Sequence, residues 1–362
     1  MTDSTRAEVL TVAADAAESD PERAQVLERV GAALRRGEIV AIPTETVYGL
    51  ACNALDDAAV QRVFDAKERP ASDPLIVHVD GLAMLDRVVD GGLPDMARQL
   101  AERFWPGPLT LIVPRHPDLP GAVTSGLPDV AVRCPAHPVA SAIITAAEVP
   151  LAAPSANRFS RVSPTSAQHV ADDLGDRIDL IVDGGRCEHG LESTVVAFDD
   201  AGAVVLRHGA IPLEAIAEIV PARTVASGGS DAQAAASPGH DERHYSPRTP
   251  AIAVRPGVIA GLDEQHLDTL AERNVRYAGY SDRPTVLPES WDTYDLGSAA
   301  ALDQVAHDLY ESLRRMDTDD VDVLILELTG ADGLGRAIDD RLTRAASSNV
   351  ISNVAAPPKA LD

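Results

Sequence analysis

The sequence predicts an α/β protein in two parts, a larger domain built on a twisted mixed sheet and a smaller domain built on an open sheet. Up to Pro221, short apolar segments of strand length mix irregularly with segments of helical period. The stretch 226–250 is rich in Gly, Ser, Ala and Pro and has almost no apolar periodicity, which indicates an interdomain linker. From Ala251 onward strands and helices alternate, as is typical of a small open sheet with helices on its faces.

The first part begins with residues 1–24, in which we expect a short leading strand and a loop. Apolar residues at helical spacing, such as Val26, Val30, Ala33 and Leu34, define a buried helix face, and Gly37 ends that helix. The same periodicity predicts helices over 22–36, 58–66, 93–104, 138–147 and 166–174. Short apolar runs predict strands at 39–43, 75–79, 109–114, 130–133, 151–153, 180–182, 193–198 and 204–207.

The second part contains a continuous apolar run at 321–328, which is typical of a strand buried on both faces of a parallel sheet. The other strands that we expect there are 251–255 and a short one at 295–296, with helices over 262–272, 299–315 and 335–346. The predicted organisation is an N-terminal extension (1–24), a first domain (25–221), a linker (222–250) and a C-terminal α/β domain (251–355).

Composition excludes several classes of protein. The 362 residues carry 31 Lys and Arg against 56 Asp and Glu, a net charge of -25, so a nucleotide or nucleic acid must be held at a locally basic site. The three cysteines form no CxxC pair, which argues against a disulfide scaffold or a cysteine zinc site and fits a reducing cytoplasm. We expect no membrane segment, and we find no GxSxG, GxxxxGK[ST] or HExxH motif.

Cationic and hydroxyl side chains gather where predicted strands end. Lys67 is one of only two lysines in the chain, and an extended segment would point Lys67 and Arg69 the same way, as a clamp for a phosphate. Thr46 follows the strand 39–43, and His78 lies at the end of the strand 75–79. Solvated turns, helix caps and a satisfied histidine are the alternatives that these segments leave open.

Further candidates follow the later strands. Arg133 ends an alternating apolar strand and suits a carboxylate. The loop after the strand 151–153 carries Ser155, Asn157 and Ser163, which suit phosphate or ribose contacts, with a Ser/Asn-rich capped loop as the alternative. Ser193 opens one strand and Arg207 ends the next, although a plain hairpin explains both. A glycine-rich run at 330–335 does not match GxGxxG and is a weak signal.

Taken together, these segments resemble the Sua5/YrdC/YciO family, in its long Sua5 form of L-threonylcarbamoyladenylate synthase. The motifs that carry the resemblance occur in family order over residues 25–215 and are PTETVYGL (43–50), KxRP…PLxxH (67–78), FWPGPLT (104–110), VAVR (130–133), APSAN (153–157) and ESTVV (192–196). HYSP at 244–247, GLGRAI at 333–338 and Arg341-Leu342 resemble the linker and C-terminal domain of the long form.

The resemblance implies a YrdC-like domain with a concave cleft, followed by a small Rossmann-like domain. It implies a nucleotidyltransferase that converts L-threonine, bicarbonate or CO2, and ATP to L-threonylcarbamoyl-AMP and pyrophosphate, with Mg2+. The product would pass to a transferase complex that forms t6A at position 37 of tRNA. Contact with tRNA or double-stranded RNA is compatible with that reaction but not required for it.

Family correspondence also implies the roles of individual residues. Lys67, Arg69, Ser155 and Asn157 form the expected catalytic set. The expected ATP site comprises Arg69, Asp73, Asp129, Ser155, Ser163, Arg207 and Tyr245, the last as a lid from the linker. The expected L-threonine site comprises Thr46, His78, Arg133, Ala153 and Ser193. Asp73 stands where the family often has Asn, Asp129 where it often has a hydroxyl residue, and residues 239–243 are more acidic than usual.

Two other functions compete with this one. A hydrogenase-maturation carbamoyltransferase also contains a YrdC-like domain, but it adds cysteine-rich zinc fingers, and this chain has no paired cysteines. An RNA-binding module would use the basic cleft without catalysis. The net charge of -25 and an aromatic content of 3% argue against an extended base-stacking surface.

Overall fold

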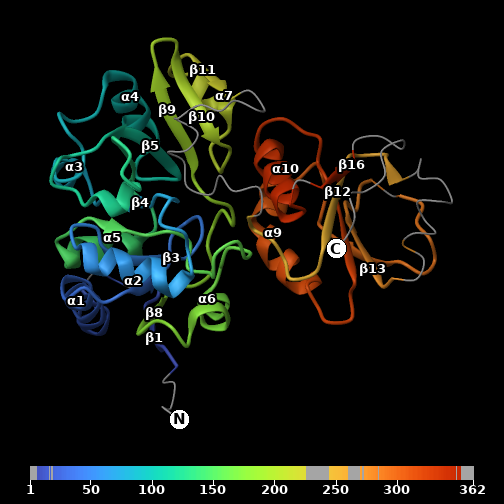
Figure 1. Cartoon of the computed structure of the whole chain (residues 1–362), viewed down its shortest axis with the longest axis horizontal. Helices are drawn as coiled ribbons and strands as arrows, with labels where there is room; N and C mark the ends of the chain where they lie inside the picture. Colours follow the sequence, from blue (N-terminus) through green and yellow to red (C-terminus); the bar gives the residue numbers. More distant parts are fainter. Residues whose placement is uncertain are drawn as a thin grey trace. The chain divides into compact units, whose positions relative to one another are not determined.

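A computed structural model describes residues 6–15, 17, 19–225, 244–259, 270, 273–283, 285–347 and 349–351 (Figure 1). The chain divides into two compact units, one formed by residues 1–159 with 163–240 and the other by residues 160–162 with 241–362. Each unit has a sheet and a hydrophobic core of its own. Most of the expected linker and, apart from Leu270, the helix expected at 262–272 lie outside the described residues.

The described part of the first unit forms an eleven-stranded mixed sheet in the order β1-β8-β2-β3-β7-β4-β6-β5-β9-β10-β11. Its strands are β1 (Glu8–Thr11), β2 (Val40–Ile42), β3 (Gly49–Asn53), β4 (Ile76–His78), β5 (Leu109–Pro114), β6 (Asp129–Arg133), β7 (Leu151–Ala152), β8 (Leu180–Asp183), β9 (Thr194–Asp199), β10 (Gly202–Arg207) and β11 (Ala222–Thr224). Its helices are α1 (Pro21–Arg35), α2 (Asp57–Lys67), α3 (Leu82–Leu85), α4 (Asp95–Phe104), η1 (Gly121–Thr124), α5 (Pro138–Ala147), α6 (Ala167–Leu174) and α7 (Leu213–Ala217).

The two faces of the central strands are buried in different clusters. Val77, Val132 and Leu111 belong to the main core of the unit. Residues of the opposite parity on the same strands form a smaller apolar cluster of Ile76, Ile112, Ala131, Val195, Ala197, Val204 and Leu206. Because side chains alternate along a strand, His78 and Arg133, two residues beyond Ile76 and Ala131, share the face of this smaller cluster.

The N-terminal segment of the first unit adds a strand to the same sheet. β1, from the expected extension 1–24, pairs in parallel with β8, with Glu8 opposite Leu180. Asp20 then caps α1 by accepting a hydrogen bond from the Glu22 amide at 3.0 Å, and Pro21 occupies the first turn. β3 follows directly after the polar segment that contains Thr46 and was not predicted as a strand from its sequence.

The second unit contains a parallel sheet in the order β14-β13-β15-β12-β16. Its described elements are β12 (Ala251–Val254), β13 (Val275–Gly279), β14 (Asp292–Asp295), α9 (Leu302–Met316), β15 (Val323–Glu327), α10 (Leu334–Ala345) and β16 (Val350–Ile351). The apolar run at 321–328 forms β15 near the centre of the sheet, as predicted, whereas β13 beside it was not predicted. None of the helices described in either unit combines the length and apolar character needed to span a bilayer.

Gly31 offers a test of how tightly α1 packs on α5. A Cβ at this position would lie 2.5 Å from the carbonyl oxygen of Ala146. Alanine favours helices by about 1 kcal/mol over glycine, but overpacking costs about 1–3 kcal/mol. We therefore expect Gly31→Ala to lower the free energy of unfolding, measured by urea denaturation.

Gly121→Ala is the matched control, because a Cβ there meets nothing within 4 Å. We expect it to change the free energy of unfolding by less than about 0.5 kcal/mol. Stabilisation by Gly31→Ala would show that α1 and α5 are not in close contact.

Candidate active site

A row of polar side chains crosses five neighbouring strands of the first unit. His78 ends β4 and lies opposite Arg133, which ends β6. Next along the sheet come Thr110 of β5 and Ser193, directly before β9, whose hydroxyl oxygens are 2.7 Å apart. Arg207 ends β10, and its Nη2 donates to the Ser193 carbonyl and hydroxyl oxygens, both at 3.1 Å. The strand order therefore brings together four predicted site residues, namely His78, Arg133, Ser193 and Arg207.

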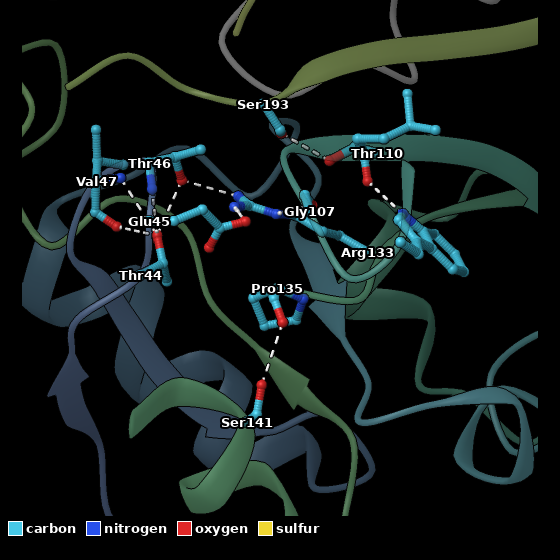
Figure 2. A network of polar contacts seen from close by, with 12 residues as sticks. Thr44, Glu45, Thr46, Val47, Gly107, Thr110, Arg133, Pro135, Ser141 and Ser193 are labelled. Atoms are coloured by element: carbon cyan, nitrogen blue, oxygen red, sulfur yellow. Dashed lines mark hydrogen bonds and ion pairs between the residues drawn. The ribbon is translucent and has the colours of Figure 1, made fainter. Parts of the chain in front are cut away.

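Arg133 is the centre of this network (Figure 2). Its Nε donates to the carbonyl oxygen of Gly107 at 3.2 Å, and its Nη1 donates to the Thr46 hydroxyl at 2.9 Å. Its Nη2 lies 2.6 Å from a carboxylate oxygen of Glu45. The side chains of Arg133 and Glu45 are 4% and 3% exposed, so this ion pair is almost fully removed from water.

The turn before β3 places Glu45 and Thr46 at Arg133. The Thr44 hydroxyl accepts hydrogen bonds from the amides of Thr46 (3.2 Å) and Val47 (3.3 Å) and donates to the Val47 carbonyl at 2.6 Å. Such a hydroxyl-capped turn is a local alternative to regular structure. Sequence reasoning named Thr46 but missed Glu45 and Thr110; an acidic residue inside a hydroxyl-rich turn after a strand was the only signal for Glu45.

Burial and charge set the protonation states in this row. Burial by itself would raise the pKa of Glu45, but the charge and hydrogen bonding of Arg133 outweigh it and lower that pKa, so the carboxylate is ionised at neutral pH. Burial and the nearby Arg133 charge lower the pKa of His78 to about 3, so its imidazole is neutral. Among the described residues, the His78 Nδ1 has no hydrogen-bond partner.

Lys67 organises a second cluster with the loop after β7. It is 1% exposed, and its Nζ donates to the backbone carbonyls of Ser155 (2.5 Å) and Asn157. Burial, together with the charge of Arg69, holds the pKa of Lys67 well below that of an ordinary lysine. The expectation of an extended 67–69 segment was wrong: Lys67 ends α2, and Glu68 adopts a left-handed backbone with φ 57°.

Arg69 is held by the residues that follow it. Its Nη2 lies 2.8 Å from a carboxylate oxygen of Asp73 and donates to the Pro74 carbonyl at 2.8 Å. Its Nε donates to the Asp73 carbonyl at 3.1 Å. Asp73, where the family often has Asn, thus stands beside a fixed cation that offsets its charge.

The remaining predicted residues fall in three places. Ala153 and Ser163 are buried in the first unit, where the Ser163 hydroxyl donates to Glu192 at 2.7 Å. Asp129 begins β6, at the opposite end of that strand from Arg133, and burial raises its pKa. Tyr245 belongs to the second unit, where its ring is 1% exposed, stacks on Tyr310 at 5.6 Å between centroids and lies under the guanidinium of Arg341.

The architecture is that of an α/β protein of two units, with a buried polar row across the central strands of the first sheet, and comparison with known proteins gives the family. The Sua5, YciO and YrdC family model, described as "Telomere recombination", matches residues 32–209. A model described as the C-terminal domain of threonylcarbamoyl-AMP synthase matches residues 211–347.

Curated relatives match almost end to end. The threonylcarbamoyl-AMP synthase of Pyrococcus abyssi is 40% identical over 88% of this chain and 93% of its own length. The threonylcarbamoyl-AMP synthase of Bacillus subtilis is 42% identical over 92% of this chain and 95% of its own length. A crystal structure of P. abyssi Sua5 complexed with L-threonine superposes with a TM-score of 0.83 at 37% identity, covering 95% of this chain and 99% of that one. The chain belongs to the Sua5 family of threonylcarbamoyl-AMP synthases.

The buried ion pair predicts a large effect of Glu45→Gln on stability. Removing one partner of a buried pair leaves the other charge uncompensated, which costs about 3–5 kcal/mol. We expect a loss of this size in the free energy of unfolding, measured by denaturant titration. Glu8→Gln is the control, because the Glu8–Arg29 pair is about half exposed and should contribute little. Equal effects of the two substitutions would contradict the burial of the Glu45–Arg133 pair.

His78 predicts a pH dependence of stability. The pKa of His78 is about 3 in the folded protein and 6.5 for an ordinary histidine, so between these pH values the unfolded chain binds a proton that the folded chain does not. Stability should therefore fall as the pH is lowered from 6.5, by up to about 1.4 kcal/mol per pH unit. Urea denaturation at several pH values should show a shallower loss for His78→Asn than for the unsubstituted protein; parallel curves would disprove this assignment.

Proposed function

We propose that the protein catalyses the family reaction, in which L-threonine, bicarbonate or CO2, and ATP yield L-threonylcarbamoyl-AMP and pyrophosphate, in the first step of tRNA t6A formation. The observation that best supports this is that the first unit contains two buried basic side chains. One is Arg133 in the polar row, and the other is Lys67 at the loop after β7. One suits the carboxylate of an amino acid and the other the phosphates of a nucleotide.

In the proposed mechanism, the polar row binds L-threonine. Arg133 binds the carboxylate, and Glu45 and Gly107 hold the guanidinium in one orientation. Thr46 and Ser193 supply hydroxyl groups, and Ala153 forms a small apolar wall. His78 is neutral, so its unpaired Nδ1 offers a hydrogen-bonding site that adds no further positive charge beside the amine.

The chemistry then needs no covalent enzyme intermediate. The neutral threonine amine attacks the carbon of CO2 and loses a proton, giving a carbamate. A carbamate oxygen attacks the α-phosphorus of ATP, and the bond to pyrophosphate breaks. Lys67 and Arg69, with Ser155 and Asn157, stabilise the charge on the phosphate oxygens. A bound triphosphate would favour the ammonium form of Lys67 and so oppose the burial that lowers its pKa.

Arg207, Ser163, Asp73 and Asp129 are the further proposed ATP contacts. Tyr245, expected from the sequence as a lid, is buried within the second unit against Tyr310 and Arg341, so no lid role is proposed for it. No group of three His, Cys, Asp or Glu side chains that could hold a metal is present among the described residues. We therefore propose that Mg2+ arrives as the ATP complex, coordinated chiefly by phosphates and water. We also propose a cytoplasmic location and delivery of the product to a t6A transferase complex.

The function is tested by incubating the purified protein with ATP, Mg2+, bicarbonate and each amino acid in turn and measuring pyrophosphate. We expect release that depends on L-threonine. Arg133→Ala should raise the KM for L-threonine about 10–100-fold with a smaller effect on the KM for ATP, because it removes a charge-assisted hydrogen bond to the carboxylate. Lys67→Ala should lower kcat about 100-fold or more, because it removes charge stabilisation in the transition state.

Arg29→Ala is the control for both substitutions, since Arg29 lies on α1 and its side chain is 49% exposed. It should leave turnover unchanged. Pyrophosphate release without amino acid dependence, or salt-sensitive RNA binding without turnover, would favour the competing functions. Equal KM changes for L-threonine and ATP in Arg133→Ala would contradict the proposed division of the site.

A further inference from the structure

The second unit has a topological switch point between two adjacent strands. β13 and β15 are neighbours in the parallel sheet. The chain leaves β13 toward β14, on one side, and leaves β15 toward β16, on the other. Because the two connections diverge, the carboxyl ends of such strands frame a crevice, which is where open α/β sheets bind ligands.

A hollow of about 270 Å³ lies at this end of the sheet. Its walls come from the end of β13 and the loop after it, including Tyr277, Gly279, Tyr280 and Arg283, and from Asp295 at the end of β14. This volume is near the lower end of the range for small-molecule pockets. All of these residues belong to the second unit, and none of them is part of the polar row around Arg133.

Tyr277, which lines the hollow, is held in place by a buried hydrogen bond. The Tyr277 hydroxyl donates to a carboxylate oxygen of Glu327, the last residue of β15, at 2.8 Å. Glu327 is 2% exposed. Gly279 makes this arrangement possible, since a Cβ there would lie 2.6 Å from the Tyr277 ring. The ring therefore lies across the end of β13 and links the two strands of the switch point.

Two further groups of the hollow have unused hydrogen-bonding capacity. Arg283 donates through one Nη to the Thr329 carbonyl at 2.7 Å and places its guanidinium 5.6 Å from the Tyr280 ring centroid. Tyr280 is 3% exposed, and within the described part of the chain its hydroxyl has no hydrogen-bond partner. A buried hydroxyl without a partner is unusual in a folded protein, and a bound polar ligand would satisfy it.

The neighbouring glycine-rich run, 330–335, does not serve as a phosphate loop. The carboxylate of Asp339 accepts hydrogen bonds from the amides of Thr329 (2.6 Å) and Gly330 (2.9 Å). The Thr329 hydroxyl accepts the amide of Ala331 at 3.1 Å. These backbone donors are therefore already occupied, and the carboxylate would repel a phosphate.

The charges of the hollow define its ligand. Among the residues that line it, Arg283 is the cation and Asp295, at the end of β14, supplies the carboxylate. A simple anion would face Asp295, and a simple cation would face Arg283. A molecule with both charges fits each group, and the aromatic and leucine walls suit an apolar side chain. We propose that the second unit binds a free α-amino acid, with its carboxylate on Arg283 and Tyr280 and its ammonium toward Asp295.

The test uses the full chain with Arg133→Ala, so that the amino acid site proposed for the first unit is weakened. Equilibrium dialysis against an equimolar mixture of the twenty L-amino acids, read by mass spectrometry, should show selective retention approaching one equivalent. Adding Arg283→Gln should reduce retention by about tenfold or more, through loss of a charge-assisted hydrogen bond. Tyr280→Phe, which removes only the hydroxyl, should reduce it by a smaller factor.

Arg315→Gln is the matched control in the same unit, with a side chain that is 67% exposed, and it should leave retention unchanged. Thermal unfolding of each variant checks that the second unit is folded. The proposal is overturned if no amino acid is retained, if Arg283→Gln and Tyr280→Phe have no effect, or if inorganic phosphate or AMP is retained at Arg283 instead. Pyrophosphate release by the unsubstituted protein is measured separately, so the proposed function stands or falls independently.

Discussion

A guanidinium buried at the end of a central strand is the constraint on which the first unit depends. Either charge of the Arg133–Glu45 pair would be costly to bury without the other. The pair fixes the turn before β3 against the end of β6, although the two segments are far apart in sequence. Burial, together with the charge of Arg133, keeps the neighbouring His78 neutral. The ion pair therefore sets the local geometry of the polar row.

The sequence predicted those helices and strands whose apolar residues follow from burial of one face or of both faces. α1, α5 and β15 show clear apolar periodicity or a continuous apolar run and formed where expected. β3 and β13 were missed for a physical reason. β3 follows a polar turn without a break, and β13 carries Arg276 and Tyr277, whose polar ends find partners at its edge and C-terminal end. Such strands are stabilised by tertiary contacts that a local pattern does not contain.

In the candidate site, too, the sequence predicted some residues, whereas others depend on tertiary contacts. Thr46, His78, Arg133 and Ser193 were named from the sequence, and the strand order brings them into one row. Glu45 could not be identified in that way, because its importance comes from a partner that only the folded sheet supplies. Lys67 was expected to form a phosphate clamp with Arg69, yet its Nζ donates to two backbone carbonyls. Spacing predicts which residue types are near one another, but not which hydrogen bonds they already make.

β1 has a consequence for how the molecule behaves with other copies of itself. It pairs along β8, and its Val9 is 49% exposed. Without this strand, β8 would present an open row of amide and carbonyl groups, a template on which a foreign strand can add. Loss of the segment before Thr11 by proteolysis would thus leave β8 as an unpaired edge strand and favour strand exchange or aggregation. The polar row would be left intact.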